Sequence, residues 1–299
     1  MKNEKILVVG GTGFIGYHTL KKLQNLNFKL FSISTKNPKK NRRVSKVKYI
    51  ICDIGNKNLL NKKLNLDFKY IINLGGYVDH SNKIKTMTSH YNGCKNLVDF
   101  FKHKKIKNFI QIGSSLEYGS SKAPNKESNL CRPRGNYGIS KYKASKYLKK
   151  IGKKNNFPYT ILRLYQVYGP NQSNNRIIPI TINACLKDKN FPCTKGFQKR
   201  DFLYIDDLTK LMISILKKKA SKKIFNVGSG KPIEIRKAIK IINNKIGLGH
   251  PQFGKIKMRK DEIKNSFPNI KRVQNQFKWR PKVSFEKGIE NTIFFYENF

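Results

Sequence analysis

The most constraining feature of this sequence is a glycine-rich turn that directly follows a short apolar run. The run ILVV leads into GGTGFIG, so glycines fall at Gly10, Gly13 and Gly16. A short apolar run bounded by glycines predicts a buried strand, and a glycine turn lets the backbone approach a ligand closely. Glycine at 16 also lets the following helix pack on the strand, and the N-terminus of that helix attracts anions. With Phe14 and Ile15 opening the helix, the segment predicts a binding site for the pyrophosphate of a dinucleotide.

The first half of the chain alternates strand-like and helix-like segments. Apolar runs predict strands at 5–9, 29–34, 48–52, 68–73, 108–112 and 159–164, and helices are expected at 14–26, 83–103 and 136–154. Strands alternating with helices form right-handed βαβ units, which build a parallel sheet covered on both faces. We therefore expect an α/β fold with a Rossmann-type, doubly wound parallel sheet.

The pattern loosens after Tyr168, where Gly169-Pro170-Asn171 marks a change to short helices and loops. This predicts a dinucleotide-binding domain over residues 1–168 and a smaller C-terminal α/β lobe for substrate over residues 169–299. Some chain segments are expected to cross between the two.

The net charge is the unusual bulk property. The chain has 63 Lys and Arg against 17 Asp and Glu, a formal net charge of +46. The lysines are spread along the whole chain, and Lys, Asn and Ile are all abundant, which favours compositional drift over a nucleic-acid surface. We expect no specific nucleic-acid partner, although a positive field attracts an anionic substrate.

The five cysteines are scattered and contain no CxxC pair, so neither a disulfide framework nor a metal site is expected. No apolar run approaches the roughly 20 residues of a membrane helix, and the N-terminal apolar stretch is too short for a signal peptide. The sequence predicts a cytoplasmic protein without a membrane span.

Two motifs in the middle of the chain bring together groups for acid–base chemistry. In YGISK, Tyr137 and Lys141 stand at i and i+4, so both side chains lie on one face of a helix. A nearby ammonium favours phenolate and makes the tyrosine a usable proton donor and acceptor. YxxxK is weak alone, because Tyr142 and Lys146 form a second match. The segment GSSLEYG follows a predicted strand and places Ser114 at the carboxyl end of the sheet, where ligands bind.

In order and spacing, these motifs resemble the extended short-chain dehydrogenase/reductases, the family of nucleotide-sugar epimerases, dehydratases and ketoreductases. The resemblance runs almost from end to end. It includes CDI (52–54), NLGG (73–76) in the place of H-L-A-A, RLYQVYGPNQ (163–172), KRDFLYIDDL (199–208) and FNVGSGKPIEI (225–235). The segments 251–262 and KWRPKVSFEKGIENTIFFY also resemble the family's substrate lobe.

The resemblance implies a role for each residue at a matching position. The catalytic residues would be Ser114, Tyr137 and Lys141. The cofactor would be bound by Gly10, Gly13, Phe14, Ile15, Gly16, Asp53, Ile54, Leu74 and Gly75, together with Tyr137 and Lys141. The nucleotide-diphosphate sugar would be bound by Ser115, Gln166, Arg200 and Arg259, with the two guanidinium groups gripping the diphosphate.

Three positions depart from the family pattern. His90 stands where the segment SHYNGCKNL usually has Asn, Gln166 replaces the usual Asn of N-V-Y-G, and Asn269 stands where an Asp often precedes the C-terminal helix. None of the three removes a catalytic group, but each alters the surroundings of the pocket.

The second strand predicts the cofactor preference. An NAD-preferring pattern has a carboxylate at its end, but here ISTKN is followed by Lys39, Lys40, Arg42 and Arg43. Without a carboxylate to repel it, and with these cations nearby, a 2′-phosphate can bind here, so NADP is favoured, with NAD possible.

The residues after Ser114 narrow the reaction. The resemblance implies that family 4,6-dehydratases carry an acid pair or Ser-Glu directly after the catalytic Ser or Thr. Here Ser115 is followed by Leu116, and the carboxylate of Glu117 comes one place late. This leaves 4-ketoreduction of an NDP-4-keto-6-deoxyhexose as the favoured reaction, with an NAD-retaining 4-epimerase as the alternative. A non-catalytic binding protein on a dehydrogenase fold is a third hypothesis. By analogy with the family, a homodimer through the helices at 83–103 and 136–154 is expected.

Overall fold

The computed structural model describes residues 3–77, 79, 81–220, 222–259 and 262–298, and these divide into two compact units. Unit 1 comprises residues 1–121, 127–164 and 209–225, and unit 2 comprises residues 122–126, 165–208 and 226–299. The chain therefore enters unit 2 briefly in a loop, enters it again after β6, and returns once to unit 1 before its C-terminal part. Among the described residues, no helix is long and apolar enough to cross a bilayer.

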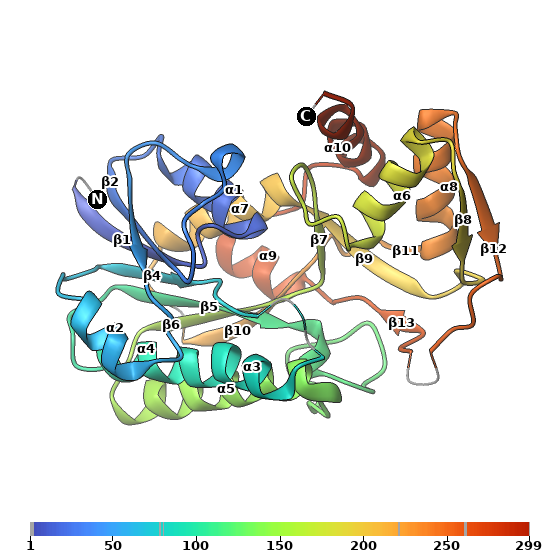
Figure 1. Ribbon diagram of the computed structural model, residues 1–299. Coiled ribbons are helices and arrows are strands. Elements are labelled where there is room, and N and C mark those ends of the chain that lie inside the picture. The colour runs from blue at the N-terminus through green and yellow to red at the C-terminus, as the bar shows by residue number, and fades with distance from the viewer. Residues whose placement is uncertain (1–2, 78, 80, 221, 260–261, 299) are drawn as a thin grey trace. The chain divides into compact units, whose positions relative to one another are not determined.

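Unit 1 is built on a seven-stranded sheet with the order β10-β6-β5-β4-β1-β2-β3 (Figure 1). All five pairings from β3 through β6 are parallel, which confirms the doubly wound arrangement. The strands are β1 (Glu4–Val9), β2 (Phe28–Ser34), β3 (Val47–Ile51), β4 (Tyr70–Asn73), β5 (Asn108–Ser114), β6 (Tyr159–Leu164) and β10 (Lys223–Val227). The strand order reverses at β1 and β4, where open α/β sheets bind ligands beyond the carboxyl ends of the strands.

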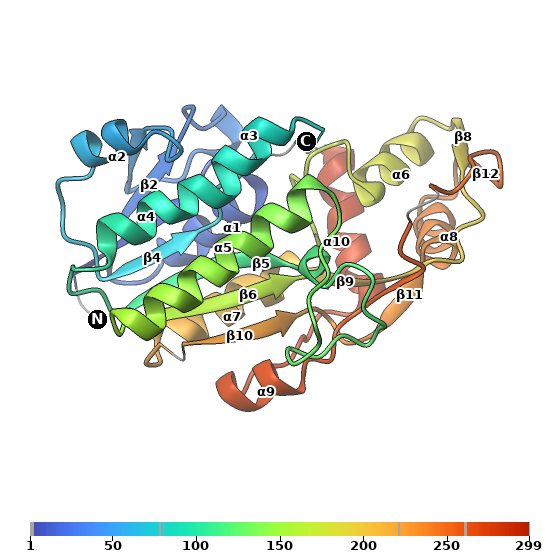
Figure 2. The same cartoon turned by 90° about the horizontal axis from the view of Figure 1, so that it is seen from below.

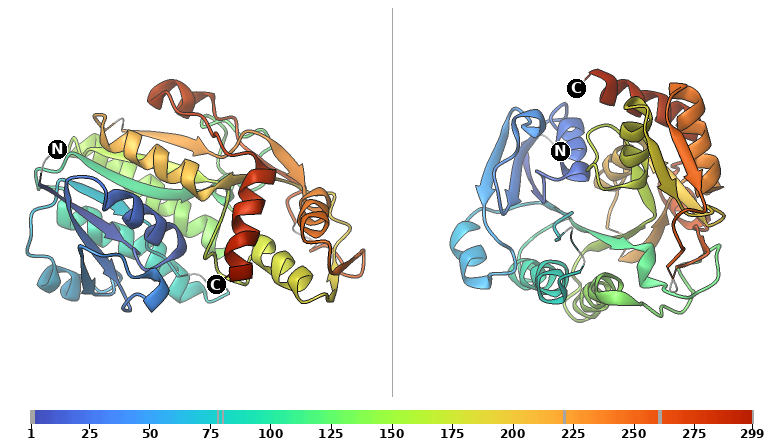
Figure 3. Two further views of the ribbon diagram at one scale, coloured as in Figure 1. Left: turned by 90° about the horizontal axis from the view of Figure 1, so that it is seen from above. Right: turned by 45° about the vertical axis from the view of Figure 1, so that its right-hand side comes forward.

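Helices cover both faces of this sheet. One face is covered by α1 (Phe14–Leu23) and α7 (Ile205–Leu216), whose Thr19 and Met212 side chains touch at 3.4 Å (Figures 1 and 3). The other face is covered by α2 (Lys57–Lys63), α3 (Lys83–Met87), α4 (Gly93–Phe101) and α5 (Gly135–Lys154). Figure 2 shows α4 and α5 side by side along the sheet. Three short turns complete the unit: η1 (Lys40–Arg42), η2 (Thr88–Asn92) and η3 (Ser115–Glu117).

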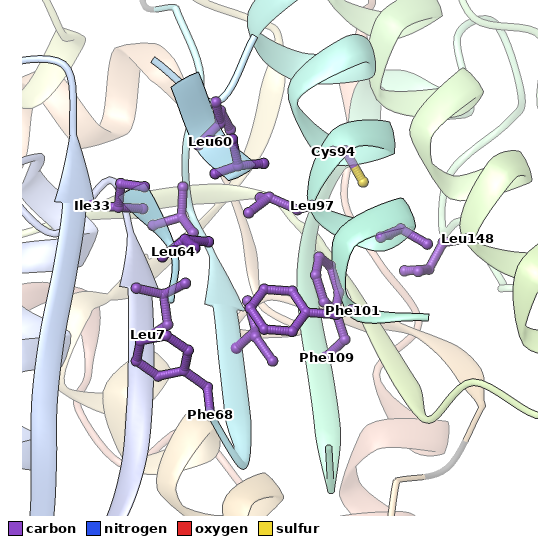
Figure 4. Close-up of a cluster of buried hydrophobic side chains, with 14 of the residues drawn as sticks. Leu7, Ile33, Leu60, Leu64, Phe68, Cys94, Leu97, Phe101, Phe109 and Leu148 are labelled. Atoms are coloured by element: carbon purple, nitrogen blue, oxygen red, sulfur yellow. The ribbon is translucent and has the colours of Figure 1, made fainter. Parts of the chain in front are cut away.

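The core of unit 1 lies between the sheet and α2, α4 and α5. In Figure 4, Leu97 and Phe101 of α4 and Leu148 of α5 gather with side chains of the strands, and each of the three is fully buried. The strand residues Ile6 to Val8 are also fully buried, as expected for a parallel sheet covered on both faces. Each fully buried aliphatic or aromatic side chain contributes roughly 1.5–3 kcal/mol, so this core fixes the sheet edge on which the motifs lie.

Unit 2 contains two small sheets and a helical layer. In one sheet, β9 (Lys199–Tyr204) pairs with β7 (Gln166–Tyr168), β11 (Pro232–Glu234) and β13 (Asn265–Ser266), and in the other β8 (Asn190–Cys193) pairs with β12 (His250–Phe253). The helices are α6 (Ile177–Leu186), α8 (Ile235–Ile246), α9 (Lys271–Phe277) and α10 (Phe285–Asn298), of which α6, α8 and α10 pack together. This confirms the smaller mixed α/β lobe.

Two buried aspartates hold the loops of unit 2. Asp201 is fully buried and accepts the backbone N–H groups of Ser229 at 2.5 Å and Gly230 at 2.7 Å. Burial raises the pKa of Asp201, although those N–H groups oppose the rise. Asp207 accepts the N–H groups of Lys282 and Val283, each at 2.9 Å, and so fixes the chain before α10. The segments KRDFLYIDDL (199–208) and FNVGSGKPIEI (225–235) therefore have structural roles in this lobe.

Candidate functional site

The glycine turn has the geometry that the sequence predicts for close approach to a phosphate. Gly10 has φ +78°, a conformation that favours glycine, and its carbonyl accepts the N–H of Gly13 at 3.0 Å. A Cβ on Gly16 would lie only 2.2 Å from the Gly10 oxygen, so any side chain there would open the turn. Helix α1 begins at Phe14 with no side chain capping its N–H groups, which leaves those donors directed at the turn. These residues fit a pyrophosphate.

The other predicted cofactor residues gather at the carboxyl ends of the neighbouring strands. Leu74 follows β4, and its N–H bonds to the Val9 oxygen at 3.0 Å, while a Cβ on Gly10 would lie 3.0 Å from the Leu74 carbonyl. Ile54 is buried next to Gly75, where an added Cβ would lie 3.2 Å from the Ile54 methyl group. The exposed Asp53, two residues after β3, uses Oδ1 to accept the Gly55 N–H at 2.8 Å. The structure thus brings the predicted cofactor residues to one edge of the sheet.

The tyrosine and lysine of YGISK lie on the first turns of α5. Lys141 is only 4% exposed, and its Nζ donates to the Ile112 carbonyl of β5 at 2.9 Å. The same Nζ lies 5.7 Å from the centroid of the Tyr137 ring. Because Nζ bonds to a neutral carbonyl, the ammonium of Lys141 has no carboxylate on this bond and is held beside the Tyr137 ring.

Helix α5 approaches the serine segment closely because of a glycine. A Cβ on Gly138 would lie 2.7 Å from the Leu116 oxygen of η3, so the helix and the turn are in backbone contact. Ser114 ends β5, which runs two residues beyond the expected end of this strand at 112. Ser114 and Ser115 therefore lie where β5 passes into η3, next to the first turn of α5, which contains Tyr137. All of these residues belong to unit 1.

Ser114 is held by a capping box. Its Oγ accepts the Leu116 N–H at 3.2 Å, and its own N–H donates to Glu117 Oε1 at 2.9 Å. A hydroxyl that accepts from the backbone still has its proton to donate. The side chain is 7% exposed, which keeps it at the margin of the buried layer.

Glu117 forms a buried ion pair that the sequence analysis did not identify. Its Oε2 accepts from Arg163 Nε at 3.0 Å and from Arg163 Nη2 at 2.9 Å, and the two side chains are 0% and 3% exposed. Burial alone would lower the pKa of Arg163, but Glu117, Tyr118 and Cys131 together raise it above its ordinary value. Gly113 lies opposite Arg163 in the sheet register and leaves room for the carboxylate. Both residues stand in motifs noted in the sequence, Glu117 in LEYG and Arg163 in RLYQ. No local sequence pattern, however, predicts a contact between residues so far apart in the chain.

The predicted substrate residues outside this motif lie in unit 2. Gln166 begins β7 and is exposed, and Arg259 is exposed after β12. Arg200 on β9 forms an ion pair with Glu262, and its Nη1 donates to the Lys199 carbonyl at 2.9 Å. Burial lowers the pKa of Arg200, and Glu262 opposes this. The guanidinium is therefore held in place by protein groups.

Two of the three departures have a visible local role. Asn269 precedes α9, and its Oδ1 accepts the N–H of Lys271, the first residue of that helix, at 3.0 Å, a bond that an Asp carboxylate could also accept. His90 is buried beside Tyr137, with the two ring centroids 4.9 Å apart. Across the described part of the chain, no group of three or more His, Cys, Asp or Glu is placed to hold a metal ion.

Comparison with known proteins places these features in a wider group. The model of a family described as "NAD dependent epimerase/dehydratase family" matches residues 6–228. The chain is 27% identical over 304 residues to CDP-abequose synthase of Salmonella typhimurium, covering 97% of each protein. It is 30% identical over 212 residues to dTDP-4-dehydro-6-deoxyglucose reductase of Escherichia coli, covering 68% of this chain and 61% of that one. UDP-glucuronic acid 4-epimerase from Bacillus cereus, solved with UDP-glucuronic acid and NAD, superposes with a TM-score of 0.88 at 26% identity, covering 98% of this chain and 99% of that one.

Proposed function

Because this chain belongs to the NAD dependent epimerase/dehydratase family, we propose that it is an NADPH-dependent 4-ketoreductase of an NDP-4-keto-6-deoxyhexose. At the coarser level, it is an NAD(P)-dependent enzyme that modifies nucleotide sugars. The observation that supports the finer proposal best is the buried Lys141, fixed on the Ile112 carbonyl with its charge 5.7 Å from the Tyr137 ring.

The proposed mechanism assigns one task to each of three side chains. When bound, the nicotinamide supplies a hydride to the ketone carbon. Tyr137 donates its phenolic proton to the ketone oxygen, and Lys141 stabilises the phenolate that remains. Ser114 donates a hydrogen bond to the same oxygen, since its Oγ already accepts from Leu116. The glycine turn and the N-terminus of α1 hold the pyrophosphate.

The environment of Glu117 favours reduction over dehydration. A dehydratase needs a carboxyl group at the sugar to take up and deliver protons. Glu117 is fully buried and bonded to Arg163 and to the Ser114 N–H, and Leu116 stands exposed where the acid would lie. Removing the hydroxyl at C6 therefore lacks its acid here, whereas reducing a ketone needs only the Ser–Tyr–Lys set.

The turn after β2 supports NADPH as the reductant. No carboxylate follows Ser34 in the segment that leads to η1. Arg42 of η1 points its Nη1 at the Thr12 carbonyl of the glycine turn, 3.5 Å away. Its charge therefore lies beside the turn proposed to bind the dinucleotide, where a 2′-phosphate would be attracted.

Replacing Arg42 by Ala is expected to raise the KM for NADPH about 10-fold or more, because a charge-assisted hydrogen bond is worth roughly 1.5–3 kcal/mol. The KM for NADH should change little. Lys48→Ala is the control, since Lys48 is an exposed cation on β3 that does not belong to the group of cations predicted to attract the 2′-phosphate. Steady-state kinetics with both cofactors measures the effect. Equal losses with NADPH and NADH would contradict a 2′-phosphate contact.

The reaction is tested with a panel of NDP-4-keto-6-deoxy sugars by following NADPH absorbance at saturating substrate. We expect consumption with one member of the panel and formation of the 4-hydroxy sugar. The alternative, favoured by the likeness to a 4-epimerase solved with NAD, predicts that the isolated protein holds NAD. It would then interconvert two NDP-hexoses without added reductant, and this outcome would overturn the reductase proposal. Salt-sensitive nucleic-acid binding without any turnover would instead support a binding protein.

The proposal extends to assembly and location. We propose a homodimer formed through the segment of α3, η2 and α4 and through α5, as the family resemblance implies, acting in the cytoplasm. Size-exclusion chromatography with light scattering tests the dimer directly.

A further inference from the structure

A histidine in an unusual helical turn lies against the proposed catalytic tyrosine. The helix formed by α3 and α4 is interrupted by η2, a π-helical turn over Thr88–Asn92 that contains His90. A π turn has one more residue than an α turn and often occurs at functional sites. This turn packs against α3, α4 and α5 and brings the buried imidazole into a T-shaped contact with the Tyr137 ring, with 4.9 Å between centroids and 78° between planes.

The imidazole is fixed by the loop that follows β4. His90 Nε2 lies 3.1 Å from the Tyr77 carbonyl. Because a carbonyl only accepts, Nε2 is the donor in this contact and carries a proton. The neighbouring Ser89 Oγ accepts the Tyr77 N–H at 2.9 Å. Two successive residues of η2 therefore bond to the backbone N–H and C=O of the same residue, Tyr77, which restricts how the histidine ring can turn.

A glycine makes room for this histidine. A Cβ on Gly76 would lie 1.9 Å from His90 Cε1 and 2.3 Å from Nδ1, so the imidazole rests directly on the glycine backbone. Gly76 stands where the H-L-A-A segment has alanine, and His90 stands where the helix usually has asparagine. The two departures are in contact, and the histidine ring fits only because the alanine methyl is missing.

We propose that His90 is a positioning residue that holds the Tyr137 ring in its proton-donating orientation, and that Gly76 is the paired change that permits it. The proposal rests on the proposed function, because it gives His90 a purpose through Tyr137. The ring of Tyr137 is then limited by its T-shaped contact with the imidazole and by the Lys141 ammonium, 5.7 Å from its centroid. An edge-to-face aromatic contact of this kind is favourable and directional.

The test is a set of kinetic variants on the purified full-length protein, with NADPH and the keto sugar identified from the panel. His90→Ala is expected to lower kcat about 10-fold with the KM for the sugar nearly unchanged, because only the orientation of the proton donor is lost. His90→Phe keeps an aromatic edge and should recover most of kcat. Gly76→Ala should reproduce the loss of His90→Ala, since its methyl displaces the imidazole. His103→Ala, an exposed histidine beyond α4, should be silent.

The double variant Gly76→Ala/His90→Asn restores the family pair and separates packing from positioning. We expect its thermal stability to recover relative to Gly76→Ala, while kcat stays low. A kcat for His90→Ala within two-fold of the wild type, or a loss that His90→Phe fails to recover, would overturn the proposal.

Failure of the proposed function has a separate signature. If the wild-type protein oxidises NADPH with none of the sugars of the panel, the reductase proposal is rejected. The contact between His90 and Tyr137 is then tested by thermal unfolding alone. The Tm changes of His90→Ala and Tyr137→Ala should be non-additive by about 2 °C if the rings stabilise each other. Additive changes would reject the positioning role whatever the activity.

Discussion

Replacing Tyr137 by Phe is expected to lower kcat for the keto sugar by about 10²–10⁴-fold, the usual contribution of a positioned proton donor. The ring remains, so its contacts with His90 and Lys141 persist and the fold should be unaffected. The Kd for NADPH, measured by fluorescence titration, should stay close to the wild-type value, because the glycine turn is untouched. Loss of kcat with retained cofactor binding identifies the phenol as the reacting group.

Tyr142→Phe is the matched control for this prediction. Lys146 Nζ lies 5.7 Å from the Tyr142 ring centroid, the same separation as between Lys141 and Tyr137. Lys146 is exposed, however, whereas Lys141 is buried against the Ile112 carbonyl. The control variant should keep full activity. Near-wild-type turnover by Tyr137→Phe would reject the mechanism, and an equal loss in Tyr142→Phe would show that the effect is structural.

The same pair of motifs shows what sequence alone could decide. YxxxK spacing places a phenol near an ammonium in both cases, and nothing local separates the two matches. The difference is burial, which depends on the β5 strand beneath α5 and on Gly138, which lets the helix approach η3. Order along the chain favoured Tyr137 because Ser114 precedes it at the end of a strand. In the structure only Lys141 has its ammonium in a low-dielectric setting, because it is buried whereas Lys146 is exposed.

Most of the fold of unit 1 follows from local patterns, because its strands are short apolar runs and α-helices connect β1 to β2, β3 to β4, β4 to β5 and β5 to β6. The predicted strand at 159–164 matches β6, and the predicted helix at 136–154 differs from α5 by one residue. The π turn at Thr88–Asn92 could not be predicted, since its periodicity is hidden inside an amphipathic helix. Nor could the return of residues 209–225 to unit 1, because the partner of β10 is a strand far earlier in the chain.

The part of the site that sequence reasoning misread is the carboxylate of LEYG. Its place in the sequence suggests only a displaced dehydratase acid at Glu117. In the structure it holds the Ser114 N–H and neutralises Arg163, whose guanidinium also lies 4.5 Å from the centroid of the Tyr118 ring. A residue's neighbours in sequence suggest chemistry, but its partner 46 positions away decides its role.

Glu117→Gln is therefore expected to lower the free energy of unfolding by about 3–5 kcal/mol, because it leaves the Arg163 charge buried without a counter-charge. Chemical denaturation followed by circular dichroism measures the loss. Glu290→Gln is the control. Glu290 pairs with Lys245 at 2.7 Å and Lys287 at 3.1 Å but is 45% exposed, so the free energy of unfolding of this variant should be nearly unchanged.

A second variant separates the stability of this pair from its effect on the serine. Glu117→Leu/Arg163→Met removes both charges and should be more stable than Glu117→Gln, since replacing a buried ion pair by apolar groups of similar volume is often neutral. Its kcat should nevertheless stay below that of the wild type, because the Ser114 N–H loses the acceptor that sets the position of its hydroxyl. If the double variant is both stable and fully active, Glu117 serves only to neutralise Arg163. If Glu117→Gln is as stable as the wild type, the buried Arg163 does not need the Glu117 carboxylate as its counter-charge.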